Sequence, residues 1–349
     1  MSVSLLKLRR TIHAKLVLDR RGKREAIKRE YENWQRQLRG DDARLYSATE
    51  QQANRFKQRI RKQNEHGIKT KEYPLILRRD CVKIQYQKRS ILAWWIRIPV
   101  NPRSIWVPIQ LPHEQEPLLR YDIRECKLIQ DNGKWFVNIT VQKEAHLKRR
   151  YAAILPIDMG IRKLATTIED GKPCFYGKEV RQTRGNYFRL RRSVGRGRII
   201  KKWRHKEQEN IKHQVHTITR HIVKKAKQAN AIIAIGNLKG IRNGNRSRSF
   251  NRRLSMQPFY LFKQYLTYKA NWEGIRVITV PEAYTSQTCH RCGVRGQRVA
   301  GRFSCQNCGL AVDADVNGAW NIAKRAHGML SHEAGAVLIP PRTLAVCEP

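Results

Sequence analysis

Four cysteines form two pairs whose spacing suits one metal ion. The pairs are Cys289-x2-Cys292 and Cys305-x2-Cys308, and twelve residues separate them. Two-residue gaps let each pair of thiolates converge on one ion, and four thiolates close a tetrahedral shell with no open position for water. In a reducing compartment, clustered cysteines are more typical of metal ligation than of disulfides. We therefore predict a zinc ribbon with one structural Zn²⁺ ion.

Two aspartates stand where a carboxylate can face a second metal site. Asp158 ends the apolar run AAILPI, and side chains at the carboxyl ends of strands in open α/β sheets commonly bind ligands. Asp315 lies in the run DADVNGAW, in the first turn of a predicted helix, where the helix dipole favours a charged carboxylate. Asp313 is suited to cap that helix. Taken alone, Asp158 is equally compatible with a turn or cap role.

The segments that position these acids alternate between strands and helices. Five apolar runs follow residue 150, and the last two, AIIAIG and RVITVP, are each preceded by a long helical stretch. This alternation predicts an α/β domain whose later strands are parallel.

The N-terminal half has a different pattern. Helical spacing over residues 21–66, with a break at Gly40, predicts a helical hairpin. Short β-rich runs from Tyr73 to Gln142, with a turn signal at Asp131-Asn132-Gly133, predict a small antiparallel barrel. Four tryptophans in these runs are expected to fill the barrel rather than stack on bases: Trp94, Trp95, Trp106 and Trp135.

The charge balance indicates a polyanionic partner. The 349 residues include 71 Lys and Arg against 28 Asp and Glu, a net charge of +43, while 40% hydrophobic residues exclude wholesale disorder. Residues 178–227 alone hold 17 basic residues against 3 acidic ones, a density that favours phosphate contact. Because the charge is spread over the whole chain, nucleic acid is the expected partner. The candidate contacts in this segment are Arg189, Arg191, Arg192, Lys201, Lys202 and Arg204.

Five ordered segments resemble one protein family. They are IDMGIRKLATT, AIIAIGNLKGI, VPEAYTSQTCHRCG, the second cysteine pair and DADVNGAWNIAKRA, and together they are similar to the RuvC-type nuclease of the TnpB family, the transposon-encoded ancestor of type V CRISPR effectors. The resemblance covers about residues 151–326, and the N-terminal half is similar only in architecture. It implies an RNA-guided DNA endonuclease with an RNase H-like fold, in which three carboxylates bind two Mg²⁺ ions. Asp158 matches the family's first acid and Asp315 its third.

The middle acid departs from the family pattern. Gly236 stands where the family usually has a glutamate, and glycine binds no metal. One interpretation is a nuclease-dead, RNA-guided DNA-binding repressor. The other is that Glu282, at the end of RVITVP, replaces the missing acid, because neighbouring strands lie about 4.8 Å apart and a glutamate can span that gap. We favour the second and predict Asp158, Glu282 and Asp315 as catalytic Mg²⁺ ligands. A structural RNA-binding protein of ribosomal type would explain the charge but not the acids.

The predicted partners are guide RNA and double-stranded target DNA with a short flanking motif. No apolar run approaches the roughly 20 residues that cross a bilayer, and the N-terminus lacks a signal peptide, so we expect no membrane partner and a place in a prokaryotic cytosol or nucleoid. Residues 240–256 are expected to form either a lid or a plain connector. The predicted organisation is a first wedge-barrel strand (1–20), a helical recognition insert (21–72), the wedge β-barrel (73–147), a RuvC-like domain (148–288 and 309–326), the inserted zinc ribbon (289–308) and a C-terminal tail (327–349).

Overall fold

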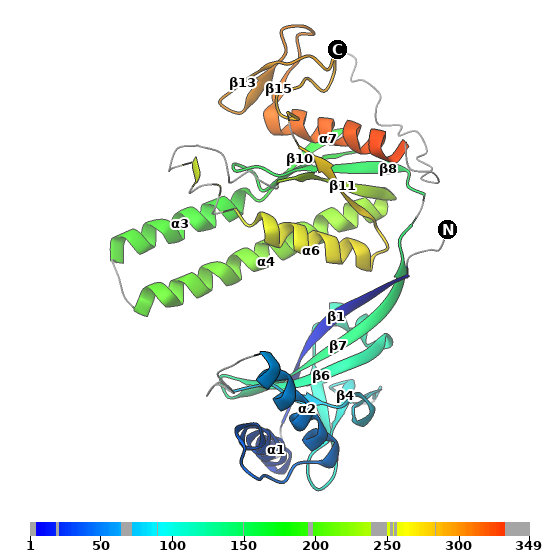
Figure 1. The fold of residues 1–349 in the computed structure, drawn as a ribbon, viewed down its shortest axis with the longest axis vertical. Coiled ribbons are helices and arrows are strands. Elements are labelled where there is room, and N and C mark those ends of the chain that lie inside the picture. The colour runs from blue at the N-terminus through cyan, green and yellow to red at the C-terminus, as the bar shows by residue number, and fades with distance from the viewer. Residues whose placement is uncertain are drawn as a thin grey trace. The chain divides into compact units, whose positions relative to one another are not determined.

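The computed structural model of the chain, drawn in Figure 1, forms two compact units. One unit comprises residues 7–144, and the other comprises residues 1–6 and 145–349. Most of the predicted loop at 240–256 and of the predicted tail at 327–349 lies outside the residues that the structure describes. The described residues are 5–18, 21–63, 72–88, 90–148, 150–194, 198–238, 250–251, 254, 257–282 and 284–331.

The unit of residues 7–144 is built on a seven-stranded sheet in the order β2-β6-β7-β1-β5-β4-β3. The sheet curls into a half-barrel, with β2 and β3 as its edges, and its described pairings β1/β5, β2/β6, β3/β4, β4/β5 and β6/β7 are antiparallel. The antiparallel prediction is therefore confirmed, but the closed barrel is not, because β2 and β3 do not pair with each other. The strands are β1 Leu5–Leu16, β2 Leu75–Leu77, β3 Lys83–Tyr86, β4 Trp94–Ile98, β5 Ile105–Gln110, β6 Asp122–Asp131 and β7 Lys134–His146; short 3-10 helices are η1 Arg79–Cys81 and η2 His113–Arg120.

Local sequence signals in this unit behave as expected. Helices α1 (Arg21–Arg39) and α2 (Ser47–Gln63) form the predicted hairpin, and Gly40 ends α1 with a φ of 112°. Asn132 and Gly133, with φ of 47° and 72°, form the two-residue turn that joins β6 to β7, a conformation that suits Asn-Gly.

The prediction for the four tryptophans is confirmed for one of them. Trp135 is buried at 3% exposure and packs edge-on against Tyr31. Trp94, Trp95 and Trp106 are only half-buried, because they lie on β4 and β5 near the β3 edge of the sheet, where fewer elements cover them.

The second unit contains a five-stranded mixed sheet in the order β10-β9-β8-β11-β12. Strands β8, β11 and the edge strand β12 are parallel, as predicted, while β9 is antiparallel to both β8 and β10. The strands are β8 Ala153–Asp158, β9 Ala165–Glu169, β10 Lys172–Tyr176, β11 Ala231–Asn237 and β12 Val277–Pro281.

Helices cover both faces of this sheet (Figure 1). Alternate residues of each strand point to opposite faces, so Leu155 and Ile233 pack with α4 (Arg198–Gln228) and α6 (Phe259–Trp272). Ile232 and Val280 instead pack with α7 (Ala314–Ser331). Helix α7 therefore extends past the predicted start of the tail at residue 327, because Leu330 is buried in the same core.

Helix α3 (Lys178–Val194) and α4 form a second helical hairpin. Glu207 of α4 is buried between the two helices, where its carboxylate pairs with the guanidinium of Arg191 and lies 4.0 Å from that of Arg184. Burial lowers the pKa of Arg184, and the Glu207 carboxylate opposes this change. The hairpin thus depends on one buried acid that holds two of its many basic side chains. Within the described part of the chain, no helix is long and apolar enough to cross a membrane.

Glu207→Ala should destabilise the protein by about 2 kcal/mol, measured by chemical denaturation. Removing one partner of a fully buried ion pair costs roughly 3–5 kcal/mol. The loss expected here is smaller than that range because the Arg191 side chain is 21% exposed. Glu209→Ala is the control, since Glu209 pairs with Lys212 at 2.7 Å with 52% of its side chain exposed, and a change within about 0.5 kcal/mol is expected. Equal losses in both variants would contradict the role of Glu207.

Candidate functional site

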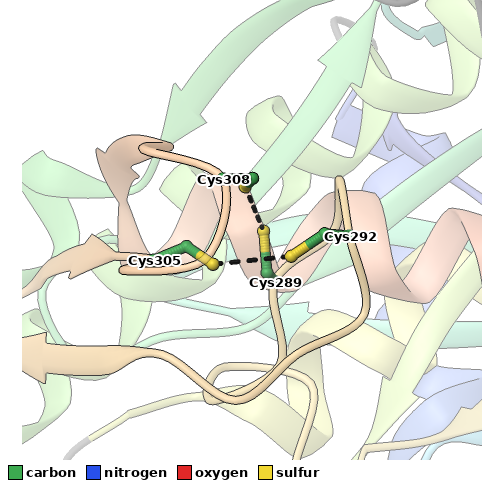
Figure 2. Close-up of side chains that lie close together, drawn as sticks. All are labelled: Cys289, Cys292, Cys305 and Cys308. Atoms are coloured by element: carbon green, nitrogen blue, oxygen red, sulfur yellow. Dashed lines mark hydrogen bonds between the residues drawn. The ribbon is translucent and has the colours of Figure 1, made fainter.

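The four cysteines converge as their spacing predicts. Figure 2 shows the side chains pointing toward one another, and all four sulfur atoms lie within 4.8 Å of one another. The Cys289 and Cys308 Sγ atoms are 3.6 Å apart, and those of Cys292 and Cys305 are 3.5 Å apart. Four thiolates around Zn²⁺ at about 2.3 Å have sulfur atoms roughly 3.8 Å apart. This cluster can therefore bind one zinc ion.

The two cysteine pairs have the same backbone structure. In each, the first cysteine N–H donates to the carbonyl five residues on, at 2.9 and 2.8 Å, and the glycine after the second cysteine donates to the first cysteine's carbonyl, at 3.0 Å in both. These glycines, Gly293 and Gly309, have φ of 78° and 69°, which glycine adopts most easily. The ribbon strands are β13 Gln297–Val299, β14 Arg302–Ser304 and β15 Ala311–Asp313.

Backbone geometry also favours a thiolate in the ribbon. A hydrogen bond from the Val294 backbone is the largest cause that lowers the pKa of the Cys292 thiol, to about 6. The thiolate is the form of cysteine that binds metal. Cys289 differs from Cys292, because burial raises the pKa of its thiol to about 12. Cys292 is therefore the cysteine of this pair whose surroundings favour the thiolate.

Three strands of the mixed sheet end at one edge with acids or a glycine on the same face. Asp158 and Gly236 lie two residues beyond Pro156 and Ala234, which are register partners, and Glu282 lies two residues beyond Val280. Period-two alternation directs all three positions toward α7. The predicted parallel arrangement of β11 and β12 is confirmed, with Gly236 opposite Val280.

Glu282 occupies the space that a side chain at position 236 would need. A Cβ atom on residue 236 would lie 2.6 Å from Glu282 Oε1 and 2.8 Å from its Cδ, far closer than atoms can approach. The Glu282 carboxyl group also shares a hydrogen bond with Asp158. The Glu282 carboxyl group therefore lies in the space that the absence of a side chain at Gly236 leaves open.

Helix α7 carries Asp315, and its glycine Gly318 leaves space for the Asp158 carboxylate. A Cβ on Gly318 would lie 2.6 Å from Asp158 Oδ2, so the helix backbone approaches that carboxylate directly. A Cβ on Gly160, which follows β8, would lie 3.5 Å from Asp315 Oδ2. Asp313 Oδ1 accepts a hydrogen bond from the Asp315 N–H at 2.9 Å, which confirms its predicted capping role.

The surroundings of the three acids disfavour their charged forms. Burial is the largest cause that raises the pKa of Asp158 well above its usual value, and the Glu282 and Asp315 charges raise it further. Burial likewise raises the pKa of Glu282 and of Asp315, and Asp313 adds to the effect on Asp315. Oxygen ligands with excess negative charge are what hard divalent cations require. The carboxylate oxygens are therefore donors of the chemical type that Mg²⁺ prefers.

Two basic residues beside the acids were not identified from the sequence. Arg298 of β13 places Nη2 3.4 Å from Asp315 Oδ1, and Lys163 Nζ lies 2.7 Å from Asp313 Oδ2. Only the packing of the ribbon against α7 shows that Arg298 lies here, because sixteen residues separate it from Asp315.

The candidate nucleic-acid contacts on the α3–α4 hairpin differ in their surroundings. Arg191 is held by Glu207, and Arg189 donates to Asn186 at 2.7 Å. Arg189, Arg192, Lys202 and Arg204 are exposed, and the side chain of Lys201 lies outside the described residues. The exposed basic residues are the ones available to a phosphate backbone.

Parts of this chain are similar to known proteins. The family model "Cas12f1-like, TNB domain" matches residues 259–322, a range that includes Glu282, all four clustered cysteines and Asp315. InsQ of Escherichia coli is 29% identical over 238 residues, which are 60% of this chain and 58% of InsQ. A TnpB-like protein of Methanocaldococcus jannaschii is 27% identical over 221 residues, covering 56% of this chain and 75% of that protein.

CRISPR-associated proteins match as well. The endodeoxyribonuclease Cas12f1 of Sulfoacidibacillus thermotolerans is 28% identical over 230 residues, or 58% of this chain and 53% of the relative. The matched regions thus span little more than half the length of InsQ and of this Cas12f1. A Cas12f1 in complex with sgRNA and target DNA has a similar fold, with a TM-score of 0.55 at 14% identity over 78% of this chain and 70% of that chain. These matches confirm the resemblance drawn from the sequence.

Zinc should be present at one ion per chain, measured by atomic absorption on protein purified without chelator. Cys305→Ser should reduce the zinc content to well below one ion and lower the thermal stability of the ribbon, because a structural zinc site contributes directly to folding. Cys174→Ser, which changes a lone half-buried cysteine of β10, should retain the full zinc content. Full zinc content in Cys305→Ser would contradict the four-cysteine site.

Asp158→Asn should raise the unfolding temperature in buffer free of Mg²⁺, and the gain over wild type should grow from pH 5 to pH 8. A carboxyl group whose folded-state pKa is raised destabilises the fold progressively as pH rises above its unfolded pKa, and asparagine lacks that charge. A gain of 1 kcal/mol corresponds to about 2–4 °C for a unit of roughly 200 residues. Scanning calorimetry gives the measurement, with the exposed Asp170→Asn as the control for net charge. A gain that shrinks with pH would contradict this account.

Proposed function

We propose that this relative of the TnpB-like and Cas12f proteins is an RNA-guided DNA endonuclease that hydrolyses phosphodiester bonds with Mg²⁺. The observation that carries the proposal is the fit between Gly236 and Glu282. The glutamate carboxylate fills the space that the absent side chain leaves and hydrogen-bonds to Asp158. A protein that had lost its nuclease would have no reason to rebuild this contact from a neighbouring strand.

We assign the mixed sheet to the RNase H-like, RuvC-type class that the family resemblance implies. Its central strand β8 ends in Asp158, and the parallel neighbours β11 and β12 bring Gly236 and Glu282 to the same edge. Ligand sites of open α/β sheets lie at this edge. The likeness to the solved Cas12f1 complex supports a common fold.

Asp158, Glu282 and Asp315 would hold two Mg²⁺ ions. When bound, a metal pair helps to activate the attacking water and stabilises the leaving oxygen. Asp158 is buried, and its carboxylate would contact an ion next to the negative charges of Glu282 and Asp315. Lys163 and Arg298 supply positive charge next to the acids, where a DNA phosphate would enter.

The proposed partners are a guide RNA and a target DNA duplex. Guide pairing would read the sequence, while the protein reads a short flanking motif and the shape of the backbone. The net charge of +43 and the exposed basic residues of the α3–α4 hairpin suit a phosphate backbone. The zinc ribbon would serve as a structural part, and the prokaryotic cytosol or nucleoid is the expected location.

Glu282→Gln should lower the rate of plasmid cleavage by more than about 100-fold, the upper end of losses for residues that only support a metal ligand. The assay uses protein with its co-purified RNA, Mg²⁺ and a library of flanking motifs. Target binding in a mobility-shift assay should be unchanged. Gly236→Ala should behave in the same way, because its Cβ would displace the Glu282 carboxylate.

Glu273→Gln is the matched control, since Glu273 follows α6 and pairs with Lys227 at 2.6 Å. Cleavage at the wild-type rate by Glu282→Gln would overturn the assignment of Glu282. A wild-type protein that binds the guided target without cutting it would instead be an RNA-guided repressor.

A further inference from the structure

One side of α7 holds the segment that carries Glu282. Asn317, Asn321 and Arg325 are spaced four residues apart and therefore lie along one stripe of the helix. All three donate to backbone carbonyls between Pro281 and Thr288. The bonds are Asn317 Nδ2 to Thr288 O at 2.7 Å, Asn321 Nδ2 to Thr285 O and to Thr288 O at 2.7 Å each, and Arg325 Nη1 to Pro281 O at 2.7 Å.

The two asparagines are buried, which makes these bonds important. Asn317 is 0% exposed and Asn321 is 7% exposed, and Thr285, whose carbonyl they contact, is 2% exposed. A buried amide that loses its partner carries a cost of roughly 1–3 kcal/mol, so the amides and the carbonyls fix each other in place.

Asn317 also joins this segment to the zinc ribbon. Its Oδ1 accepts from the His290 backbone N–H at 3.0 Å and lies 3.0 Å from His290 Nδ1. His290 follows the zinc ligand Cys289, and its ring stacks on Trp320 of α7 at 5.8 Å between centroids. One side chain therefore contacts both the end of the Glu282 segment and the first cysteine pair.

The position of the Glu282 backbone depends on this segment, because Glu282 lies outside the strand. Strand β12 ends at Pro281, so the sheet does not hold the Glu282 backbone. A turn holds it instead: Glu282 O accepts from Thr285 N at 3.2 Å and from Thr285 Oγ1 at 2.9 Å. The carboxylate must nevertheless reach over Gly236 to Asp158.

We propose that Asn317 and Asn321 are positioning residues that set the Glu282 carboxylate in the candidate Mg²⁺ site. This inference rests on the proposed function, since it concerns how the chain supplies its middle acid. Glu282 lies on a turn, and its carboxylate can occupy the place of a side chain at position 236 only if that turn keeps one conformation. The hydrogen bonds from Asn317 and Asn321 hold the turn against α7.

Asn321→Ala should raise the Mg²⁺ concentration for half-maximal cleavage by about 10-fold or more, within the range for residues that orient metal ligands. Mg²⁺ affinity measured by isothermal titration calorimetry should fall by a similar factor. Hydrogen exchange at the amides of Thr285, Gln287 and Thr288 should become faster, while zinc content and guided target binding stay at wild-type values. Asn321→Leu, which keeps the side-chain volume without the donor, should show the same changes if the alanine variant folds poorly.

Thr219→Ala is the matched control, because it removes two hydrogen bonds of a buried side chain: Thr219 Oγ1 donates to Val215 O at 2.7 Å and accepts from Lys269 Nζ at 2.8 Å. Faster exchange in Asn321→Leu with Mg²⁺ affinity within twofold of wild type would overturn the positioning role. An equal loss of Mg²⁺ affinity in Thr219→Ala would also overturn it, since the effect would then be general destabilisation. A wild-type protein that binds no Mg²⁺ would overturn the proposed function itself, and this inference with it.

Discussion

The candidate site of the second unit depends on three carboxyl groups that their surroundings make costly to charge: Asp158 is buried, and Glu282 and Asp315 are half-buried. Asp158, Glu282 and Asp315 come from β8, from the turn after β12 and from α7, and burial together with neighbouring charge raises the pKa of Asp158 well above its usual value. Burial and neighbouring negative charge both favour the protonated form of a carboxyl group unless a cation compensates the charge. The strands and the helix that carry these acids pack in two apolar cores, one on each face of the sheet. Such surroundings suit the divalent cation that we propose for this site.

Glycines make the crowding geometrically possible. A side chain at Gly236 would collide with Glu282, and one at Gly318 would collide with Asp158. Alanine at position 318 would favour the helix by about 1 kcal/mol, so glycine there reflects a need for space and not for helix stability. The backbone of α7 can then approach Asp158 closely, and the same helix presents Asp315 one turn earlier.

Much of this arrangement was predictable, because it depends on short sequence periods. Parallel strands end at a common edge of the sheet, and this rule predicted Glu282 beside Gly236. The C-x2-C pairs likewise predicted the sulfur cluster. Contacts between distant segments were not predictable: the pairing of Arg191 with Glu207, the approach of Arg298 to Asp315 and the asparagine stripe of α7 involve no local pattern. The open half-barrel was missed for a similar reason, since strand runs do not show whether the edges pair.

The position of the zinc ribbon in the chain follows from the same constraint. Thirty-two residues separate Glu282 from Asp315, and the ribbon occupies most of them. A flexible connection of this length would lose substantial entropy when its ends are fixed near each other, and metal clips that close long loops oppose that loss. Two hydrogen bonds close loops within this connection, from Gly296 N to Gln287 O at 3.0 Å and from Ala314 N to Gly301 O at 2.9 Å. The cysteine cluster thus lies in a hydrogen-bonded connection between the two carboxylates, and the buried amide of Asn317 joins it to the helix that carries Asp315.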